Sequence, residues 1–309
     1  MSVEPEAKPA IGVVGGSGLY AMQELEIVAR HRVDTPFGNP SDELVEGRLQ
    51  DVPVVFLARH GKNHCFLPSE VPYRANIWAM KALGVRYLLS VSAVGSLQED
   101  VRPLDMVLPD QFLDRTHRRT DTFFGEGCVA HVAFADPVCT GLSACLARAA
   151  EEQIEDDTRV HRGGTYVCME GPAFSSRAES EWYRTLGATV IGMTNGTEAK
   201  LAREAEIAYA SLAMVTDFDG WHPDHDNVTV DMVVGNLQAN AERAQRVVRN
   251  AVRRLHKEPF NSPAHDALRD ALLSRPEHVP PGTRAKLDLL TRRYWGDFAA
   301  ESRNENEKA

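Results

Sequence analysis

Apolar and polar positions along the chain predict strands that alternate with helices. Short, almost wholly apolar runs of strand length recur, and segments with a helical spacing of apolar residues separate them. A continuous apolar run indicates a strand buried on both faces, which is typical of parallel sheets. We therefore expect an α/β fold, with a single domain built on a central mixed β-sheet flanked by helices.

The expected elements follow one another without an internal repeat. Pro109 predicts a bulge or an edge within its strand, and Ser176 with Glu179 forms a capping box that opens a helix. The polar stretch 114–136, here called the excursion, is long enough to indicate a functional or interfacial loop. Strands are expected at 10–14, 43–50, 52–58, 87–95, 105–113, 163–170, 188–194 and from 209, and helices at 69–83, 137–152, 176–187, 197–206 and 229–257.

The C-terminal part of the sequence differs from what precedes it. After the long amphipathic helix, two short helical patterns follow, and the last eleven residues are polar. Such a polar end is predicted to be disordered. We expect one main domain over residues 1–257 and a helical extension with a disordered tail over 258–309.

Composition narrows the class of protein. A net charge of −10 argues against a general nucleic-acid binder. Five scattered cysteines, without any Cys-x-x-Cys pair, predict reduced thiols in a cytoplasmic protein and no zinc site. No apolar run approaches the roughly 20 residues that span a membrane, and residues 1–10 lack the apolar core of a signal peptide.

Two carboxylates follow directly on an apolar run, which predicts that they stand at the end of a buried strand. The run starts at Tyr209 and stops at Asp217 and Asp219, with Phe218 between them. Ligands of open α/β sheets bind beyond the carboxyl ends of the strands. Carboxylates there can accept hydrogen bonds from a ring edge or deliver a proton to it. Taken alone, the two acids could equally cap the next loop.

Cationic and hydroxyl donors stand at the ends of other predicted strands. Arg59 and His60 follow the run 52–58, and elsewhere small residues let backbone N–H groups approach an anion. This combination suits an oxyanion such as phosphate. For each motif alone, a tight turn or a solvated basic pair is the alternative. The candidate donors are Ser17, Arg59, His60, Ser92, Ala93 and Thr194.

An aromatic ring adds a possible stacking partner. Phe174 lies between a predicted strand and the capping box, where it could stack on a planar ligand or pack into the core. A site that holds phosphate and a heterocycle together suggests phosphorolysis of a nucleoside.

Eight motifs then carry a resemblance to a known family. They run in order over roughly residues 10 to 255, so together they are far more specific than any one of them. The chain resembles the 5′-methylthioadenosine phosphorylase branch of the purine nucleoside phosphorylase family. The motifs are Gly15-Gly-Ser-Gly-Leu19, Thr35-Pro-Phe-Gly38, Leu57-Ala-Arg-His-Gly61, Tyr73-Arg-Ala-Asn-Ile-Trp78, Ala93-Val-Gly-Ser-Leu97, Asp110-Gln-Phe-Leu-Asp114, Glu170-Gly-Pro-Ala-Phe-Ser-Ser-Arg-Ala-Glu179 and Thr216-Asp-Phe-Asp219.

The resemblance implies a role for each candidate. The six donors would hold phosphate. Asp217 would hydrogen-bond N7 of the purine and support protonation of the leaving base, and Asp219 would accept from the 6-amino group. Phe174 would pack against the base, Met193 would contact the ribose, and His131 would be supplied by a neighbouring subunit of a homotrimer. The 5′ pocket would be lined by His64, Val230, Val233 and Val234.

The implied reaction is phosphorolysis of 5′-methylthioadenosine, or of another 5′-modified 5′-deoxyadenosine, to adenine and the 5-modified ribose 1-phosphate. Inorganic phosphate would be the co-substrate, with no metal, no organic cofactor, no nucleic acid and no membrane involved. The alternatives are a 5′-deoxyadenosine or 5′-halo-5′-deoxyadenosine phosphorylase, a 6-oxopurine nucleoside phosphorylase, a nucleosidase that uses water, and a non-catalytic binding protein. A nicotinamide dehydrogenase would need a full dinucleotide loop, which Gly15-Gly-Ser-Gly18 does not supply.

The sequence departs from the family pattern in three places. Asn195-Gly-Thr-Glu198 lacks the proline usual before that glutamate, which puts the loop beside Met193 and Thr194 in doubt. Ala173 stands where arginine is frequent. Residues 258–309 carry no family motif, and because the C-terminal segment of related enzymes closes over the 5′ pocket, they could alter the preferred 5′ group.

Overall fold

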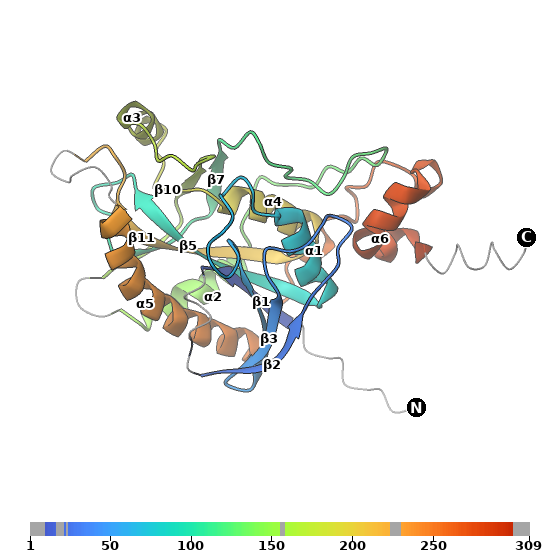
Figure 1. The fold of residues 1–309 in the computed structure, drawn as a ribbon, viewed down its shortest axis with the longest axis horizontal. Coiled ribbons are helices and arrows are strands. Elements are labelled where there is room, and N and C mark those ends of the chain that lie inside the picture. The colour runs from blue at the N-terminus through green and yellow to red at the C-terminus, as the bar shows by residue number, and fades with distance from the viewer. Residues whose placement is uncertain (1–9, 17–21, 23, 155–157, 223–229, 299–309) are drawn as a thin grey trace, which may run out of the picture.

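The fold is built on one mixed sheet. The computed structural model describes residues 10–16, 22, 24–154, 158–222 and 230–298, and at 10, 230–235, 237 and 238 it describes the backbone alone. Within these residues the sheet has 11 strands in the order β2-β3-β4-β1-β5-β10-β9-β7, with β11 beside β5, then β6 and β8 (Figure 1). The α/β fold with a central mixed sheet is confirmed.

Parallel pairs form the centre of the sheet. β1 lies between β4 and β5, parallel to both, and β11 runs parallel to β5. β10 joins β5 in antiparallel register and brings β9 and β7 to that edge. The strands are β1 (Ala10–Gly15), β2 (Leu25–His31), β3 (Leu44–Leu49), β4 (Val52–Ala58), β5 (Val85–Ser96), β6 (Met106–Leu108), β7 (Gln111–Asp114), β8 (Val160–Arg162), β9 (Thr165–Cys168), β10 (Val190–Gly192) and β11 (Ala208–Phe218).

Helices cover both faces of the sheet, which is why the central strands are apolar on both sides. On one face α2 (Thr140–Glu151) and α5 (Val230–Lys257) pack on side chains such as Val13 and Leu89. On the other, α1 (Tyr73–Ala82) and α4 (Asn195–Glu204) pack on Val14 and Leu88 (Figure 1). α3 (Arg177–Thr185) opens with the expected capping box of Ser176 and Glu179.

Several predicted boundaries were wrong, each for a local reason. Residues 105–113 form two strands, β6 and β7, because Pro109 has no N–H to donate to a ladder. The helix expected from residue 69 begins at Tyr73, directly after Pro72. The helix expected from Thr197 begins at Asn195. β2 was not predicted because it is an edge strand with exposed apolar residues, among them Ile27 and Val28.

The C-terminal segment, residues 258–298, starts against the α2 and α5 cluster through Phe260 and Ala264 and continues along the α1 and α4 side of the molecule. It contains short 3₁₀ turns at Pro263–Asp266 and Pro276–His278 and the helix α6 (Pro281–Trp295). α6 contributes Leu287 and Leu290 to the hydrophobic cluster of α1 and α4. In Figure 1 α6 lies beyond α1, across the molecule from α3 and the carboxyl end of β11. The tail 299–309, predicted to be disordered, lies outside the described residues.

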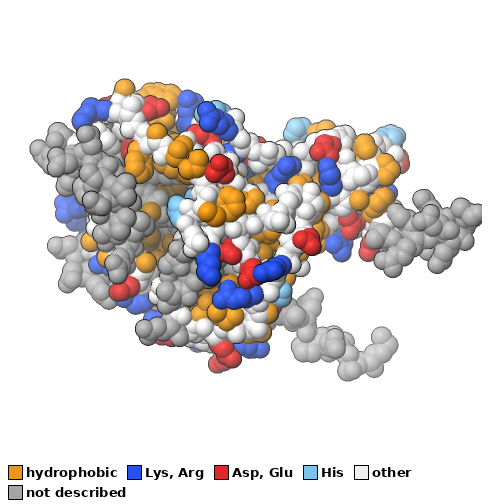
Figure 2. Space-filling view, viewed as in Figure 1, with side chains coloured by type: hydrophobic (Ala, Val, Ile, Leu, Met, Phe, Trp, Pro, Cys, Tyr) orange, Lys and Arg blue, Asp and Glu red, His pale blue; other side chains and the backbone are white. Residues whose placement is uncertain are grey.

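The molecular surface carries mixed charge. Figure 2 shows basic and acidic side chains interspersed over one face of the molecule. Among the described helices, none combines the length and the apolar character that crossing a membrane requires.

Candidate active site

The two acids lie where the strand pattern placed them, at the end of β11. The register between β5 and β11 shifts there: Val215 is opposite Val94, whereas Asp217 is opposite Gly95, so Thr216 is an extra residue in the strand. Such a bulge changes the direction of the side chains that follow. A Cβ added to Gly95 would meet Asp217 Oδ2 at 3.2 Å and Asp219 Cβ at 3.4 Å, so both acids crowd the backbone of this glycine.

The environments of the two acids differ. Asp217 and Asp219 are 7% and 3% exposed. Burial raises the pKa of Asp217 to about 6; a hydrogen bond from Thr216 opposes this rise, and the charge of Asp219 adds to it. Burial also raises the pKa of Asp219, but hydrogen bonds from Ser180, the Gly220 backbone and Ser175 lower it. Asp217 is therefore suited to hold a proton near neutral pH, and Asp219 to accept hydrogen bonds.

Arg59 is buried at the end of β4, and its donors are largely occupied. Its Nε donates to Glu198 Oε1 at 2.5 Å, and one terminal nitrogen donates to Glu198 Oε2 at 3.2 Å and to Ser90 Oγ at 2.7 Å. The other terminal nitrogen donates to Val91 O at 3.0 Å. The planar fork expected for phosphate thus faces Glu198. Arg59 contributes a buried positive charge at the strand ends, with one remaining N–H on a terminal nitrogen for an anion.

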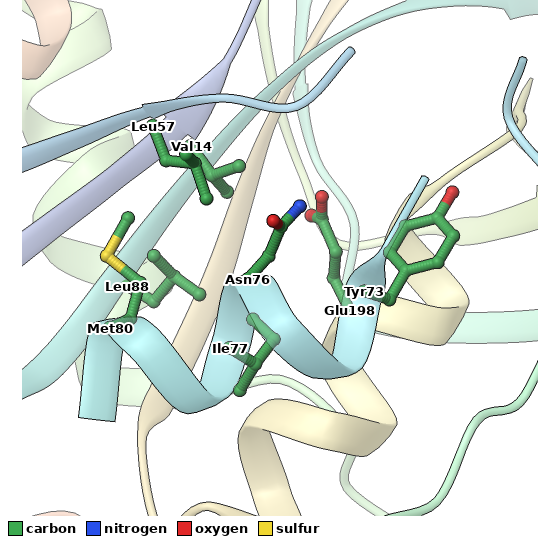
Figure 3. A pocket seen from close by; sticks show the side chains of 8 residues that line it. All are labelled: Val14, Leu57, Tyr73, Asn76, Ile77, Met80, Leu88 and Glu198. Carbon is green, nitrogen blue, oxygen red and sulfur yellow. The ribbon is translucent and has the colours of Figure 1, made fainter. Parts of the chain in front are cut away.

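Glu198 is the centre of the network that fixes Arg59. It lies in the first turn of α4, and its Oε2 also accepts from Ser90 Oγ at 2.8 Å and Tyr209 Oη at 3.0 Å. Figure 3 shows the carboxylate of Glu198 and the amide of Asn76 pointing toward one another beside a void of about 10 Å³, the size of one water molecule. Burial would lower the pKa of Arg59, but the charge and hydrogen bonds of Glu198 raise it above the ordinary value, so the guanidinium stays charged.

His60 follows Arg59 and is held by one ring nitrogen. Its Nδ1 lies 2.8 Å from the carbonyl oxygen of Phe66 and therefore carries a proton, which leaves Nε2 for a ligand. Burial, with the neighbouring charge of Arg59, lowers the pKa of His60 to about 4. The ring stacks on that of His64, with centroids 4.3 Å apart. The structure thus brings together His60, a predicted phosphate donor, and His64, a predicted 5′-pocket residue, whose side chain is exposed.

The strand β5 supplies a free hydroxyl beside an open backbone. Ser92 Oγ is buried and has no hydrogen-bond partner within the described part of the chain. Its neighbour Ala93 is exposed although both lie within the sheet, so the backbone is accessible at this point. Thr194, at the N-terminus of α4, is buried and donates through Oγ1 to Asn195 Oδ1 at 3.1 Å. An unpaired buried hydroxyl is costly without a partner, which fits a ligand that accepts from it.

The departure at Asn195-Gly196-Thr197 leaves this end of the sheet intact. Asn195 is fully buried, and its side-chain amide donates to Ser211 Oγ on β11, which ties the start of α4 to the sheet. Gly196 fits against Cys168, and α4 starts here in the orientation that delivers Glu198.

Arg119 is a site residue that the sequence analysis missed. It lies in the excursion, and its side chain is 1% exposed. It donates to Glu170 Oε1 at 3.2 Å, to Glu170 O at 2.8 Å, to Tyr73 Oη at 3.2 Å and to the carbonyl oxygen of Met193. Arg119 thus ties the excursion to the strand ends beside Met193. The available signal was one arginine in the polar excursion and Glu170 in the motif 170–179, two opposite charges without an assigned role.

The remaining predicted site residues have fewer contacts with the strand-end residues described above. Phe174 is 50% exposed, in front of α3, and Met193 is partly buried against the cluster around Ile191. His131 is exposed, and its backbone N–H donates to Ala271 O of the C-terminal segment, not to the strand-end residues. Ser17 lies outside the described residues, and of Val230, Val233 and Val234 the structure describes the backbone alone. No metal-binding group of three or more His, Cys, Asp or Glu side chains occurs among the residues described.

Comparisons with known proteins agree with this geometry. The phosphorylase superfamily matches residues 10–253. The chain is 59% identical over 284 residues to the S-methyl-5′-thioadenosine phosphorylase of Thermosynechococcus vestitus, covering 92% of this chain and 98% of that protein. It is 55% identical over 285 residues to the enzyme of the same name from Geobacter sulfurreducens, covering 92% and 98%.

Solved structures show the same likeness. A methylthioadenosine phosphorylase from an Antarctic soil metagenomic library superposes with a TM-score of 0.88 at 53% identity, covering 92% of this chain and 99% of that one. A variant of the adenosine/methylthioadenosine phosphorylase of Schistosoma mansoni, in complex with methylthioadenosine, gives 0.75 at 39% identity, covering 81% and 93%. The chain belongs to the phosphorylase superfamily and, within it, to the methylthioadenosine phosphorylase branch.

Proposed function

We propose that this protein catalyses the phosphorolysis of 5′-methylthioadenosine to adenine and 5-methylthioribose 1-phosphate. The observation that supports it best is the pair of buried acids at the end of β11, one with its pKa raised to about 6 and one held by hydrogen-bond donors. An adenine ring needs both: a proton or hydrogen bond at N7 when it leaves, and an acceptor for its 6-amino group.

The proposed reaction assigns each group a step. The N9–C1′ bond breaks and its electron pair stays with the purine, while Asp217 gives a proton to N7. A phosphate oxygen bonds to C1′ and neutralises the positive charge that develops on the sugar. Arg59, His60, Ser92, Ala93 and Thr194 hold phosphate, together with Ser17. Asp219 accepts from the 6-amino group. The proposal involves no metal and no organic cofactor.

The substrate pocket is completed by the other predicted residues. Phe174 packs against the base, Met193 contacts the ribose, and His64, Val230, Val233 and Val234 line the 5′ pocket, with His131 contributed by a neighbouring subunit. The proposed assembly is a homotrimer; the exposure of His131, in a loop whose backbone N–H donates to Ala271 O of the C-terminal segment, supports it. Five free cysteines support a cytoplasmic location. The division into a phosphorylase domain, 1–257, and a helical extension, 258–309, completes the proposal.

Release of adenine, measured with and without phosphate, tests the function. The substrates to compare are 5′-methylthioadenosine, 5′-deoxyadenosine, 5′-chloro-5′-deoxyadenosine, adenosine and inosine. Phosphate-dependent release that is fastest from 5′-methylthioadenosine and absent from inosine supports the proposal. Equal release without phosphate would make the protein a nucleosidase. Preference for another 5′ group or for inosine would point to the corresponding alternative enzyme.

The Ser180 hydroxyl is expected to set the specificity for adenine. It donates from α3 to Asp219 Oδ2 in a buried position. Ser180→Ala removes that donor, so the pKa of Asp219 rises and its carboxylate is less well held for the 6-amino group. We expect KM for 5′-methylthioadenosine to rise about tenfold, in line with the loss of one hydrogen bond to a charged group, with kcat less affected. Ser143→Ala on α2 is the control; an unchanged KM for Ser180→Ala would contradict the role.

A further inference from the structure

Trp221 is a buried aromatic residue that the proposed reaction does not use. It lies three residues after Phe218, where β11 ends, and it is 6% exposed. Its ring packs in a hydrophobic cluster with Leu97 and Tyr183. A tryptophan ring has one polar group, the indole N–H, and this group usually has a partner when it is buried. In this protein that partner connects Trp221 with Asp219.

Two donors converge on the carbonyl oxygen of Ser96, at the end of β5. The backbone N–H of Asp219 donates to it at 2.9 Å, and the indole Nε1 of Trp221 donates to it at 2.8 Å. These two bonds use both lone pairs of the oxygen. The backbone N–H of Trp221 also donates to the carbonyl oxygen of Asp219 at 2.5 Å. The main chain of Asp219 is therefore joined to β5 directly and, a second time, through Trp221.

The helix α3 contacts the same two residues. Ser180 Oγ donates to Asp219 Oδ2. The guanidinium carbon of Arg184 lies 3.4 Å from the ring centroid of Trp221, and its Nη1 donates to Leu97 O at 3.1 Å. Ser180 and Arg184 are four residues apart, so they lie on one face of the helix. Trp221 thus contacts β5 through its indole N–H and α3 through the face of its ring.

The position of Asp219 is important because the group that it is proposed to bind is a single amino group. A hydrogen bond weakens steeply when its angle departs from the preferred range. Two sets of contacts fix the carboxylate: the bond from Ser180 fixes the side chain, and the bonds to Ser96 O fix the main chain that carries it. Removing the indole N–H would loosen the second set and leave the first in place.

We propose that Trp221 is a positioning residue for base recognition, which holds the turn 218–222 against β5 so that the Asp219 carboxylate meets the 6-amino group of adenine. The inference rests on the proposed function, in which Asp219 accepts from that group. Trp221 acts through Asp219. Its loss is therefore expected to weaken recognition of the 6-amino group and to leave the rest of the purine ring bound as before.

The test compares the binding of adenine with that of purine, which lacks the 6-amino group, by isothermal titration calorimetry. Wild-type protein is expected to bind adenine at least about tenfold more tightly, as for a hydrogen bond to a charged acceptor. Trp221→Phe keeps an aromatic ring for Arg184 and removes the N–H, while Ser96 O keeps the N–H of Asp219 as its donor. We expect Kd for adenine to rise about three- to tenfold and Kd for purine to stay unchanged. Equal weakening of both ligands, or of neither, would overturn the proposal.

Two further variants separate this role from damage to the packing. Trp182→Phe makes the same substitution on α3, where the ring is 44% exposed and the Arg115 guanidinium lies over it; both dissociation constants should stay unchanged. A loss of adenine affinity equal to that of Trp221→Phe would overturn the proposal. In an Asp219→Ala background no carboxylate is left to position, so adding Trp221→Phe should not weaken adenine binding further. A further loss there would mean that Trp221 acts by packing alone, and the proposal would fail.

The wild-type measurement keeps this inference separate from the proposed function. Wild-type protein that binds adenine no more tightly than purine would refute the role of Asp219 in the proposed function, before any variant is compared. Wild-type protein that prefers adenine, with the same preference in Trp221→Phe, would refute the role of Trp221 alone.

Discussion

Replacing Asp217 with asparagine is expected to lower kcat/KM for 5′-methylthioadenosine by about 10²- to 10⁴-fold, the usual contribution of a general acid. Asparagine keeps the shape of the side chain but cannot transfer a proton to N7. The basic limb of the pH profile should disappear with it. Steady-state kinetics from pH 5 to 9 measure both effects. Asp219→Asn is the matched control: it should weaken binding of adenine nucleosides and keep the basic limb.

Asp217→Asn is also expected to be more stable than the wild type above pH 6. The pKa of Asp217 rises from 3.8 to about 6 on folding, so its favourable contribution is complete below pH 4 and is lost as pH rises from 4 to 6. Asparagine does not ionise, so this loss is absent from the variant. We expect the free energy of unfolding of Asp217→Asn at pH 8 to exceed that of the wild type by about 1–3 kcal/mol. Urea unfolding at pH 4 and pH 8 measures the difference. A variant that is both inactive and less stable at pH 8 would mean that Asp217 is structural.

Replacing Glu198 with alanine is expected to cost about 3–5 kcal/mol of stability, because it leaves the charge of Arg59 buried without a partner. The Arg59 and Glu198 side chains are 4% and 3% exposed. Arg59 would also lose the carboxylate that fixes its orientation, so KM for phosphate should rise. Unfolding in urea and phosphate-dependent kinetics measure the two effects.

An exposed pair supplies the comparison. Glu181 on α3 lies 3.9 Å from Arg184 and is largely solvent-exposed, so Glu181→Ala should cost less than about 1 kcal/mol. Glu198→Gln keeps the shape and one acceptor oxygen but places an NH2 donor where the other carboxylate oxygen accepts, so its cost should fall between these limits. If Glu198→Ala were as stable as Glu181→Ala, the buried pair would not anchor the strand ends at which we propose that phosphate binds.

The sequence predicted the strands that are buried on both faces, because their apolar runs are continuous. It also placed Asp217, Asp219, Arg59 and His60 at strand ends, which the structure confirms. It did not predict β2, whose exposed edge position removes the usual pattern, or the break at Pro109. The pattern of apolar and polar positions indicates which segments are buried. Edge strands, and short strands in irregular stretches, are too little buried to be predicted from it.

The side-chain partners in the site were harder to predict than the positions. Arg59 was expected to face phosphate, but in the fold its fork faces Glu198, which is 139 residues away in sequence. Arg119 was missed for the same reason, since its partners Glu170 and Tyr73 come from separate motifs. Single motifs show which residues lie at the strand ends, and tertiary structure decides which of them neutralise one another.

The excursion is paired with the far end of the chain. Leu273 N donates to Val129 O, and Val129 N donates to Ser274 Oγ, a separation of 145 residues. During synthesis on a ribosome, residues 129–131 therefore stay without these partners until the C-terminal segment has left the exit tunnel. The sheet can form earlier, but the loop that carries His131 is expected to become ordered last, so the nascent protein would acquire its sheet before the loop that we propose to contribute His131 to a neighbouring subunit.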